Sequence, residues 1–168
     1  MSIRARFEDA IVLLRGGRHD GALLSALVAV AATSRLRFPR GTQSLVGAGV
    51  MRDAEAFETL FRDMFSRRSP LRTSGSVRIA FRGELVEIER IFYRYLRCNL
   101  LHEAELPADI EIVFEQATDP HLMFQAAAPG GSLRLGLNWV DLLLQMVAGA
   151  PENATAFEDI LKANPLPP

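Results

Sequence analysis

The chain has 168 residues, of which 49% are hydrophobic and 23% charged, an ordinary globular composition at a length typical of one domain. Its single cysteine, Cys98, excludes an internal disulfide and favours a reducing compartment such as the cytoplasm. The net charge of −1 excludes a generic polyanion binder, but the charge is uneven, with +2 over residues 1–61, +5 over 62–97 and −8 over 98–168. We therefore expect any basic surface to be local and to come from the middle third.

The first forty residues predict two helices. Residues 3–15 place apolar side chains at helical spacing, and Gly16-Gly17 ends this helix. The second helix covers 19–37 and stops before Phe38-Pro39, because the residue that precedes a proline disfavours the helical region. The apolar stretch 22–32 is about half the length that crosses a bilayer, so it predicts a buried, central helix.

The middle of the chain predicts a connection and two further helices. Residues 40–51 are glycine-rich but lack the Gly-Lys-Ser/Thr of a phosphate-binding loop, so we interpret them as a plain connection. A third helix covers 52–66 and is broken by the segment RRSPLRTSGS. The longest periodic segment, residues 81–103, predicts a long fourth helix.

The last third predicts a small sheet between helices. The alternating runs IEIVFEQ, LMFQA and SLRLGL are separated by Asp119-Pro120 and Pro129-Gly-Gly131, which indicates two or three antiparallel strands within about residues 109–137. Helices follow over about 138–164, the first capped by Asn138.

A capping box of Thr155 and Glu158 predicts the start of the last helix. The predicted fold class is mainly α (α+β), a helical bundle with a small antiparallel sheet inserted before the C-terminal helices. We interpret the whole chain, residues 1–168, as a single domain.

The predicted helix 81–103 has two contrasting faces when it is wound at about 100° per residue. Its apolar face would carry Leu85, Ile88, Phe92, Leu96 and Tyr95. Its opposite face would carry a cationic stripe of Arg90, Arg94 and Arg97. Because like charges at this spacing repel one another, the stripe favours anions as partners, either carboxylates or phosphates.

Polar residues interrupt the apolar face near its end. Asn99 and His102 lie on or beside that face and need hydrogen-bond partners there. In a purely structural interpretation Asn99 caps neighbouring backbone, and His102 lies near a helix C-terminus, where positive charge is favoured. Tyr93 and Tyr95 flank Arg94, an arrangement that suits stacking on bases, although tyrosines at helical spacing are more often core and interface residues.

The sequence RYLRCNLLHE resembles the R-x4–6-H signature of HEPN-domain proteins. Four residues separate its arginine from its histidine, at the end of a long predicted helix. Its RC-x-L-x-HE pattern is similar to an uncharacterised bacterial branch of that family. The resemblance covers the predicted helical core, about residues 3–103, and implies a HEPN-like bundle. The predicted sheet and the last helices would be additions to this bundle.

Many HEPN domains are metal-independent endoribonucleases that act as dimers, so the resemblance implies an RNA-binding or RNA-cleaving homodimer without a metal or other cofactor. Arg97 and His102 would be the motif residues, with Asn99 beside them. An imidazole can take the proton from a ribose 2′-OH, and a guanidinium can hold the phosphate as negative charge develops. Nuclease members usually have a polar residue directly after the arginine, a position held here by Cys98.

The spacing of the motif sets a condition on this interpretation. Five steps along a helix turn through about 140°, so Arg97 and His102 diverge on one straight helix and converge most easily across a two-fold axis. A homodimer is therefore a requirement of the enzymatic hypothesis.

Two other classes of function remain open. One is a non-catalytic helical module for dimerisation or regulation, and the other is a binder of a nucleotide or small anion clamped by the cationic stripe. We expect no membrane association, because the apolar stretch 22–32 is too short to cross a bilayer. We also expect no metal site, because the histidines lack metal-ligand spacing and there is one cysteine. The RNA and any partner protein are not identified by the sequence.

Overall fold

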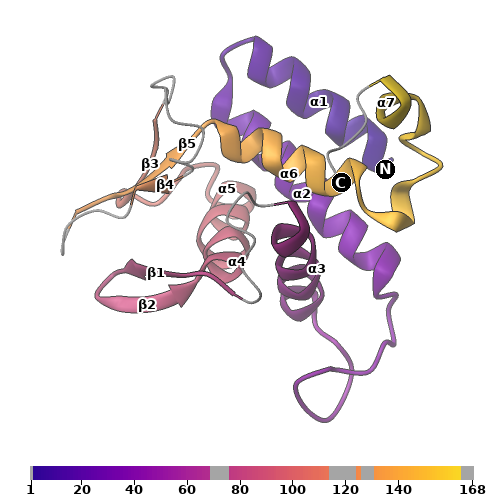
Figure 1. Ribbon diagram of the computed structural model, residues 1–168. Helices are drawn as coiled ribbons and strands as arrows, with labels where there is room; N and C mark the ends of the chain where they lie inside the picture. The colour runs from indigo at the N-terminus through magenta and orange to yellow at the C-terminus, as the bar shows by residue number, and fades with distance from the viewer. Residues whose placement is uncertain (1, 69–75, 114–123, 126–130, 164–168) are drawn as a thin grey trace.

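The computed structural model describes residues 2–68, 76–113, 124–125 and 131–163, and it has a mainly helical architecture with a small β component (Figure 1). The predicted mainly α (α+β) fold class is confirmed. The first three helices lie where periodicity predicted them, as α1 (Ile3–Arg15), α2 (His19–Arg37) and α3 (Asp53–Arg68).

The turn between α1 and α2 follows from its glycine pair. Gly17 has a φ of 72°, a left-handed conformation that glycine adopts without steric cost. The N–H of Arg18 donates to the carbonyl of Leu13 at 2.9 Å, and the N–H of Gly17 donates to that of Leu14 at 3.1 Å. These two bonds form a Schellman motif, which satisfies the last carbonyls of α1 and turns the chain into α2.

Helix α2 is the central element of the fold. It contacts α1, α3 and α6 (Asn138–Ala148), and nine of its 19 residues are buried. Small side chains such as Ala22, Ala26 and Ala29 allow neighbouring helices to approach it on several sides. The apolar stretch within α2 is therefore a core helix, as expected. In the part of the chain that is described, no helix is both long and apolar enough to span a membrane.

The predicted helix over 81–103 is wrong at its start. Residues 78–87 form an antiparallel hairpin of β1 (Arg78–Phe81) and β2 (Glu84–Glu87), and the helix begins only at Ile88. Both turn residues, Arg82 and Gly83, have positive φ angles of 53° and 80°, which matches the twist of a tight hairpin. Leu85, assigned to the apolar helix face, is instead an exposed strand residue.

The second sheet is partly as predicted. It has the order β3 (Ile110–Val113), β5 (Leu133–Gly136), β4 (Phe124–Gln125), within the expected range. Strands β4 and β5 are antiparallel, but β3 and β5 are parallel, with Ile110 opposite Leu133, so a wholly antiparallel sheet is wrong. The predicted turn at Asp119-Pro120 lies outside the described residues, and so do residues 129 and 130 of the predicted turn at Pro129-Gly-Gly131.

The C-terminal helices occur close to their predicted places, but their capping was predicted wrongly. Helix α6 already includes Asn138 as its first residue, so this side chain does not cap it and its Oδ1 has no hydrogen-bond partner among the described residues. After a short 3-10 helix, η2 (Pro151–Asn153), helix α7 (Glu158–Ala163) begins at Glu158 itself. A Thr155 capping box would require an earlier start.

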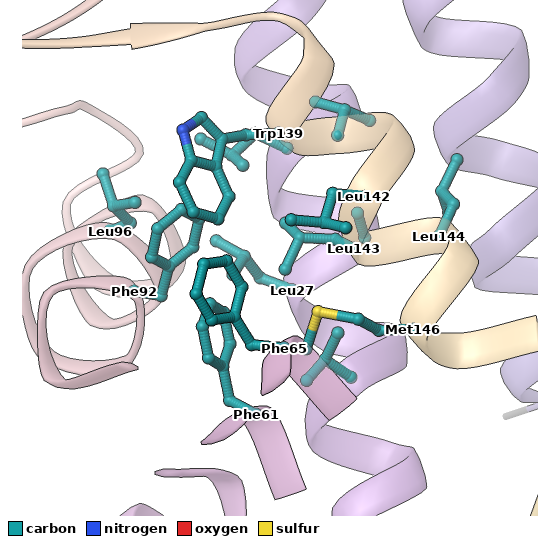
Figure 2. Packing of buried hydrophobic residues seen from close by; sticks show 14 of the residues in the cluster. Leu27, Phe61, Phe65, Phe92, Leu96, Trp139, Leu142, Leu143, Leu144 and Met146 are labelled. Carbon is teal, nitrogen blue, oxygen red and sulfur yellow. The ribbon is translucent and has the colours of Figure 1, made fainter. Parts of the chain in front are cut away.

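A cluster of aromatic side chains within the core joins three helical segments (Figure 2). Phe92 packs with its ring centroid 5.0 Å from that of Phe61 on α3 and 4.6 Å from that of Trp139 on α6. Phe65 stacks on Trp139 at 5.8 Å. All four rings are fully buried, and each contributes about 1.5–3 kcal/mol to folding through removal of apolar surface from water. This cluster holds the segment around Phe92 against α3 and α6.

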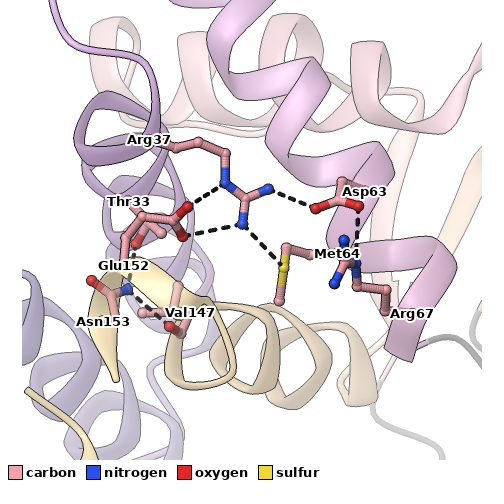
Figure 3. A network of polar contacts seen from close by, with 8 residues as sticks. All are labelled: Thr33, Arg37, Asp63, Met64, Arg67, Val147, Glu152 and Asn153. Carbon is pink, nitrogen blue, oxygen red and sulfur yellow. Dashed lines mark hydrogen bonds and ion pairs between the residues drawn. The ribbon is translucent and has the colours of Figure 1, made fainter. Parts of the chain in front are cut away.

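A polar network fastens the far end of α2 to α3 and η2 (Figure 3). The guanidinium of Arg37 donates to Asp63 at 2.6 Å and to Glu152 at 2.5 and 3.1 Å. Nearby, the Asn153 amide donates to Thr33 Oγ1 at 2.9 Å and to the Val147 carbonyl at 2.8 Å. These bonds satisfy polar groups that are mostly hidden from water, so the network stabilises one relative placement of the three elements.

The Arg37–Glu152 pair predicts an acid-dependent loss of stability. The hydrogen bond from Arg37 lowers the pKa of Glu152, so the pair stabilises the fold at neutral pH and its contribution is lost as the pH falls through the lowered pKa. We expect Glu152→Gln to lower the free energy of unfolding by about 1–3 kcal/mol at pH 7, measured by urea titration.

The same variant should show little difference from wild type in acid, where the Glu152 carboxyl is protonated in both states. Glu158→Gln is the matched control, because Glu158 is exposed and pairs with exposed Lys162 on the same helix. We expect the control to change stability by about 0.5 kcal/mol or less. Equal losses in the two variants would contradict a special role for the Arg37 network.

Candidate functional site on helix 88–102

All the predicted site residues lie on one continuous helix. It is formed by α4 (Ile88–Arg90), a seven-residue π segment η1 (Ile91–Arg97) and α5 (Cys98–His102), and we call it helix 88–102. Its inward face carries buried residues at steps of four: Ile88, Phe92, Leu96 and Leu100. A π segment closes its hydrogen bonds on the fifth residue along and so has more than 3.6 residues per turn, which keeps such a series on one face.

The predicted cationic stripe lies on the outer side of this helix. Arg90 and Arg94 are exposed, and Arg97 is half-buried. Among the described residues, none of the three has a carboxylate oxygen within 4.0 Å. Two of them lie over tyrosine rings instead, Arg97 at 5.3 Å from the centroid of Tyr93 and Arg94 at 5.6 Å from that of Tyr95. The stripe is therefore oriented by cation–π contacts, which leave the positive charge available to a ligand.

The most favourable hollow for an anion lies between α2 and helix 88–102, and we call it the Arg97 pocket. It encloses about 280 Å³. Its apolar wall comes from α2, and its charged groups come from three parts of the chain; the lining consists of Val28, Ala31, Ala32, Ser34, Arg35, Arg40, Asp53, Tyr93 and Arg97.

The charges of the Arg97 pocket do not cancel. Arg35 is held by a very short ion pair with Asp53, which neutralises both. Arg40 and Arg97 have no such partner among the described residues, so the lining retains a charge of about +2. The Nε of Arg97 is also shielded from solvent and has no hydrogen-bond partner there. A buried donor without an acceptor is costly, and this cost is additional to the unbalanced charge of the lining.

A second hollow, of about 370 Å³, adjoins the first at Tyr93 and is lined by both signs of charge. Glu89 is only 1% exposed, and it accepts hydrogen bonds from Arg62 at 2.7 Å and from Ser76 at 2.9 Å. Burial raises the pKa of Glu58, while the positive charge of Arg90 opposes that rise. With its carboxylates facing its arginines, this hollow is close to neutral and is a poorer anion site than the Arg97 pocket.

A third hollow, of about 440 Å³, adjoins the second at Arg94 and also contains Tyr95, Asn99, Glu103 and Glu105. Its Arg82 is paired with Asp109 at 2.6 Å, so the carboxylates outnumber the remaining cation. The Nδ2 of Asn99 donates to the backbone carbonyl of Tyr95 at 2.7 Å. Asn99 thus bonds to its own helix, as the structural interpretation expected, and it does not line the Arg97 pocket.

The two motif residues are not brought together within one chain. Arg97 lines the pocket against α2, whereas His102 is the exposed last residue of helix 88–102 and lines none of the three hollows. Cys98, between them, is half-buried with a free thiol. Among the residues that the structure describes, no group of three histidine, cysteine, aspartate or glutamate side chains is placed to hold a metal ion.

Several lining residues were missed by sequence reasoning. Arg35, Arg40 and Asp53 come from α2, the following connection and the start of α3, and nothing in their local pattern marks them as a site. The only sequence signal was the abundance of arginine, which does not distinguish cations paired with carboxylates from unpaired ones.

The comparison with known families covers nearly the whole chain. The sequence model of the Rv1289 family matches residues 2–159. The chain belongs to the Rv1289 family. No curated protein and no solved structure matches it. The family match includes every residue of helix 88–102 and of the Arg97 pocket. The family description names no activity, so the likeness to HEPN domains remains a hypothesis.

Because the carboxylate of Glu89 is buried, we expect the stability of the fold to depend strongly on its partner Arg62. Arg62→Met would leave this charge buried, with Ser76 as its remaining donor among the described residues, and we expect a loss of about 2–4 kcal/mol in the free energy of unfolding, measured by urea titration. The double variant Arg62→Met, Glu89→Gln removes the charge as well, so it should recover part of that loss. A double variant at least as unstable as Arg62→Met would contradict this account of the pair.

Proposed function

We propose that this protein binds a small phosphate-bearing ligand of about nucleotide size in the Arg97 pocket. The observation that carries the proposal is that two guanidiniums, of Arg97 and Arg40, line one hollow without a carboxylate partner among the described residues. A guanidinium presents several donors in a planar fork that matches a phosphate group. A phosphate monoester carries about −1.5 to −2 charges at neutral pH, which complements two cations.

The rest of the pocket suits the organic part of such a ligand. Val28, Ala31 and Ala32 offer an apolar wall opposite the Tyr93 ring. Burial raises the pKa of the Tyr93 phenol, so its hydroxyl stays protonated and can donate a hydrogen bond. The volume of about 280 Å³ is near the lower end for small-molecule sites, which favours a mononucleotide or the terminal phosphate of an RNA over a larger cofactor.

Ligand titration followed by calorimetry and by thermal unfolding tests this function. The ligands are inorganic phosphate, the four ribonucleoside monophosphates, adenosine without phosphate, and short single-stranded RNAs with and without a 5′-phosphate. We expect the phosphorylated compounds to bind and to raise the unfolding temperature, while adenosine does not. Arg97→Ala and Arg40→Ala should each weaken binding about tenfold or more, because each removes a charge-assisted bond.

The matched control is Arg15→Ala, which removes an exposed arginine from the last turn of α1 and does not line the pocket. It should bind as wild type does. Binding that is indifferent to Arg97→Ala, or equal affinity for adenosine and its monophosphate, would contradict the proposed site. Tighter binding of 5′-phosphorylated RNA than of mononucleotides would identify RNA ends as the ligand.

A second candidate function is cleavage of RNA by a homodimer. It is favoured by the exposure of His102 at the end of the helix, where it is accessible to another copy, together with the unpartnered Arg97. In this proposal His102 of one copy removes the proton from a ribose 2′-OH, and Arg97 of the other holds the phosphate. The 2′-oxygen then bonds to phosphorus as the bond to the 5′-oxygen breaks, and the proton returns to that leaving oxygen, which gives a 2′,3′-cyclic phosphate and a free 5′-hydroxyl. Cys98, at the position where nuclease members usually have a polar side chain, would contribute no base.

This second function predicts metal-independent cutting that depends on His102. A pool of labelled single-stranded RNAs is incubated in EDTA with wild type, His102→Ala and Arg97→Ala, while light scattering follows the oligomeric state. We expect wild type to be a dimer that cuts, and both variants to remain dimers with cutting reduced at least 100-fold. A folded wild-type protein that binds nucleotides but leaves RNA intact would exclude cleavage and preserve the first function.

A further inference from the structure

The connection between α2 and α3 is an ordered finger. Its two stems pair through an isolated bridge between Gln43 and Val50, supported by the N–H of Met51 donating to the carbonyl of Thr42 at 2.8 Å. The N–H of Ser44 donates to the carbonyl of Gly49 at 2.9 Å and closes the tip. Figure 1 shows this finger extending away from the helices at the lower end of α3.

The tip is held in one shape by a carboxylate from α3. The Oε1 of Glu55 accepts hydrogen bonds from the backbone N–H of Leu45 at 2.6 Å and from the Ser44 hydroxyl at 3.0 Å. The hydroxyl oxygen of Ser44 in turn accepts bonds from the N–H groups of Val46 and Gly47, both at 3.2 Å. With four of its backbone N–H groups bonded internally, those of residues 44–47, the tip presents its side chains outward at little further ordering cost.

Two apolar side chains at this tip, and one on the stem beside it, are open to solvent. Leu45 is 65% exposed, Val46 85% and Val50 58%. No charged residue occurs between positions 41 and 51. Three large apolar side chains gathered on one projecting loop differ from singly scattered surface residues, and such groupings mark interaction sites.

The two stems below the tip are cationic. Arg40 and Arg52 are exposed, and neither forms an ion pair within the described part of the chain. The nearby carboxylates are occupied, Glu55 by the loop backbone and Asp53 by Arg35. The finger therefore has an uncharged apolar end above a pair of unpaired positive charges.

We propose that this finger docks on an anionic lipid surface, with Leu45 and Val46 inserted among the acyl chains and Arg40 and Arg52 at the level of the headgroups. Apolar residues that enter the interface together with cations that meet anionic headgroups are the combination that binds peripheral proteins to such membranes. A groove on a protein would explain the apolar tip but would give no reason for a cation on each stem. The expectation of no membrane association rested on spanning segments, and surface docking needs none.

Vesicle co-sedimentation tests the proposal with the full chain. We expect wild type to bind vesicles that contain phosphatidylglycerol and to bind phosphatidylcholine vesicles weakly, with binding reduced by high salt. The double variant Leu45→Ser, Val46→Ser should lose about tenfold or more in partition, and Arg52→Glu about fivefold or more. Val46→Trp should show a blue-shifted emission on phosphatidylglycerol vesicles only, above the constant signal of buried Trp139.

Matched controls separate this site from other causes. Val12→Ser removes an apolar side chain that is 68% exposed on α1, and Arg15→Glu reverses an exposed charge there; both should bind vesicles as wild type does. The tip variants should keep wild-type nucleotide affinity, which makes failure here distinguishable from failure of the Arg97 pocket. No binding to either vesicle, equal losses in tip and control variants, or a wild-type oligomer that the tip variant dissociates would each overturn the proposal.

Discussion

The packing of Phe92 between Phe61 and Trp139 is the constraint on which the site depends. These rings come from helix 88–102, α3 and α6, and their centroids are 5.0 and 4.6 Å from that of Phe92 (Figure 2). Because a close-packed core admits few alternatives, the inward face of helix 88–102 is set once these rings are buried. Its outward face is then set as well, which is why Tyr93, Arg94 and Arg97 point toward hollows instead of into the core.

The arginines of this protein divide into two groups with different roles. Arg35, Arg37 and Arg62 meet carboxylates from other elements and fasten the fold together. Arg40 and Arg97 have no such partners among the described residues, although carboxylates are abundant in the sequence. Two guanidiniums that line one hollow without carboxylate partners leave that hollow positively charged, which favours a ligand of opposite charge. This contrast is the physical basis for placing phosphate recognition at the Arg97 pocket.

The π segment relates the geometry of helix 88–102 to the HEPN hypothesis. Its wide turns keep Ile88, Phe92 and Leu96 on one buried face and place Arg97 over the ring of Tyr93. His102 then follows in a short α-helical end, away from the pocket. Phosphate binding needs only one copy of this arrangement, whereas RNA cleavage needs a second copy to bring a histidine to the arginine. The two proposals therefore differ in what they require of assembly, and the Rv1289 family match is compatible with either.

The sequence by itself determined the features that depend on near neighbours. Apolar spacing and local stop signals, such as Gly17 and Pro39, placed α1, α2 and α3, and the same periodicity put Arg90, Arg94 and Arg97 on the outer side of a helix. Only the tertiary structure decided the rest. The apolar residues of 78–87 suit either strands or a helix. The segment forms two strands because the Arg82-Gly83 turn lets β2 pair with β1. Strand β3 pairs in parallel with β5, and Arg37 bonds to Glu152, 115 positions away. The local sequence around each of these segments does not indicate its partner. The Arg97 pocket belongs to this second class, because it exists only where α2, the finger and helix 88–102 meet.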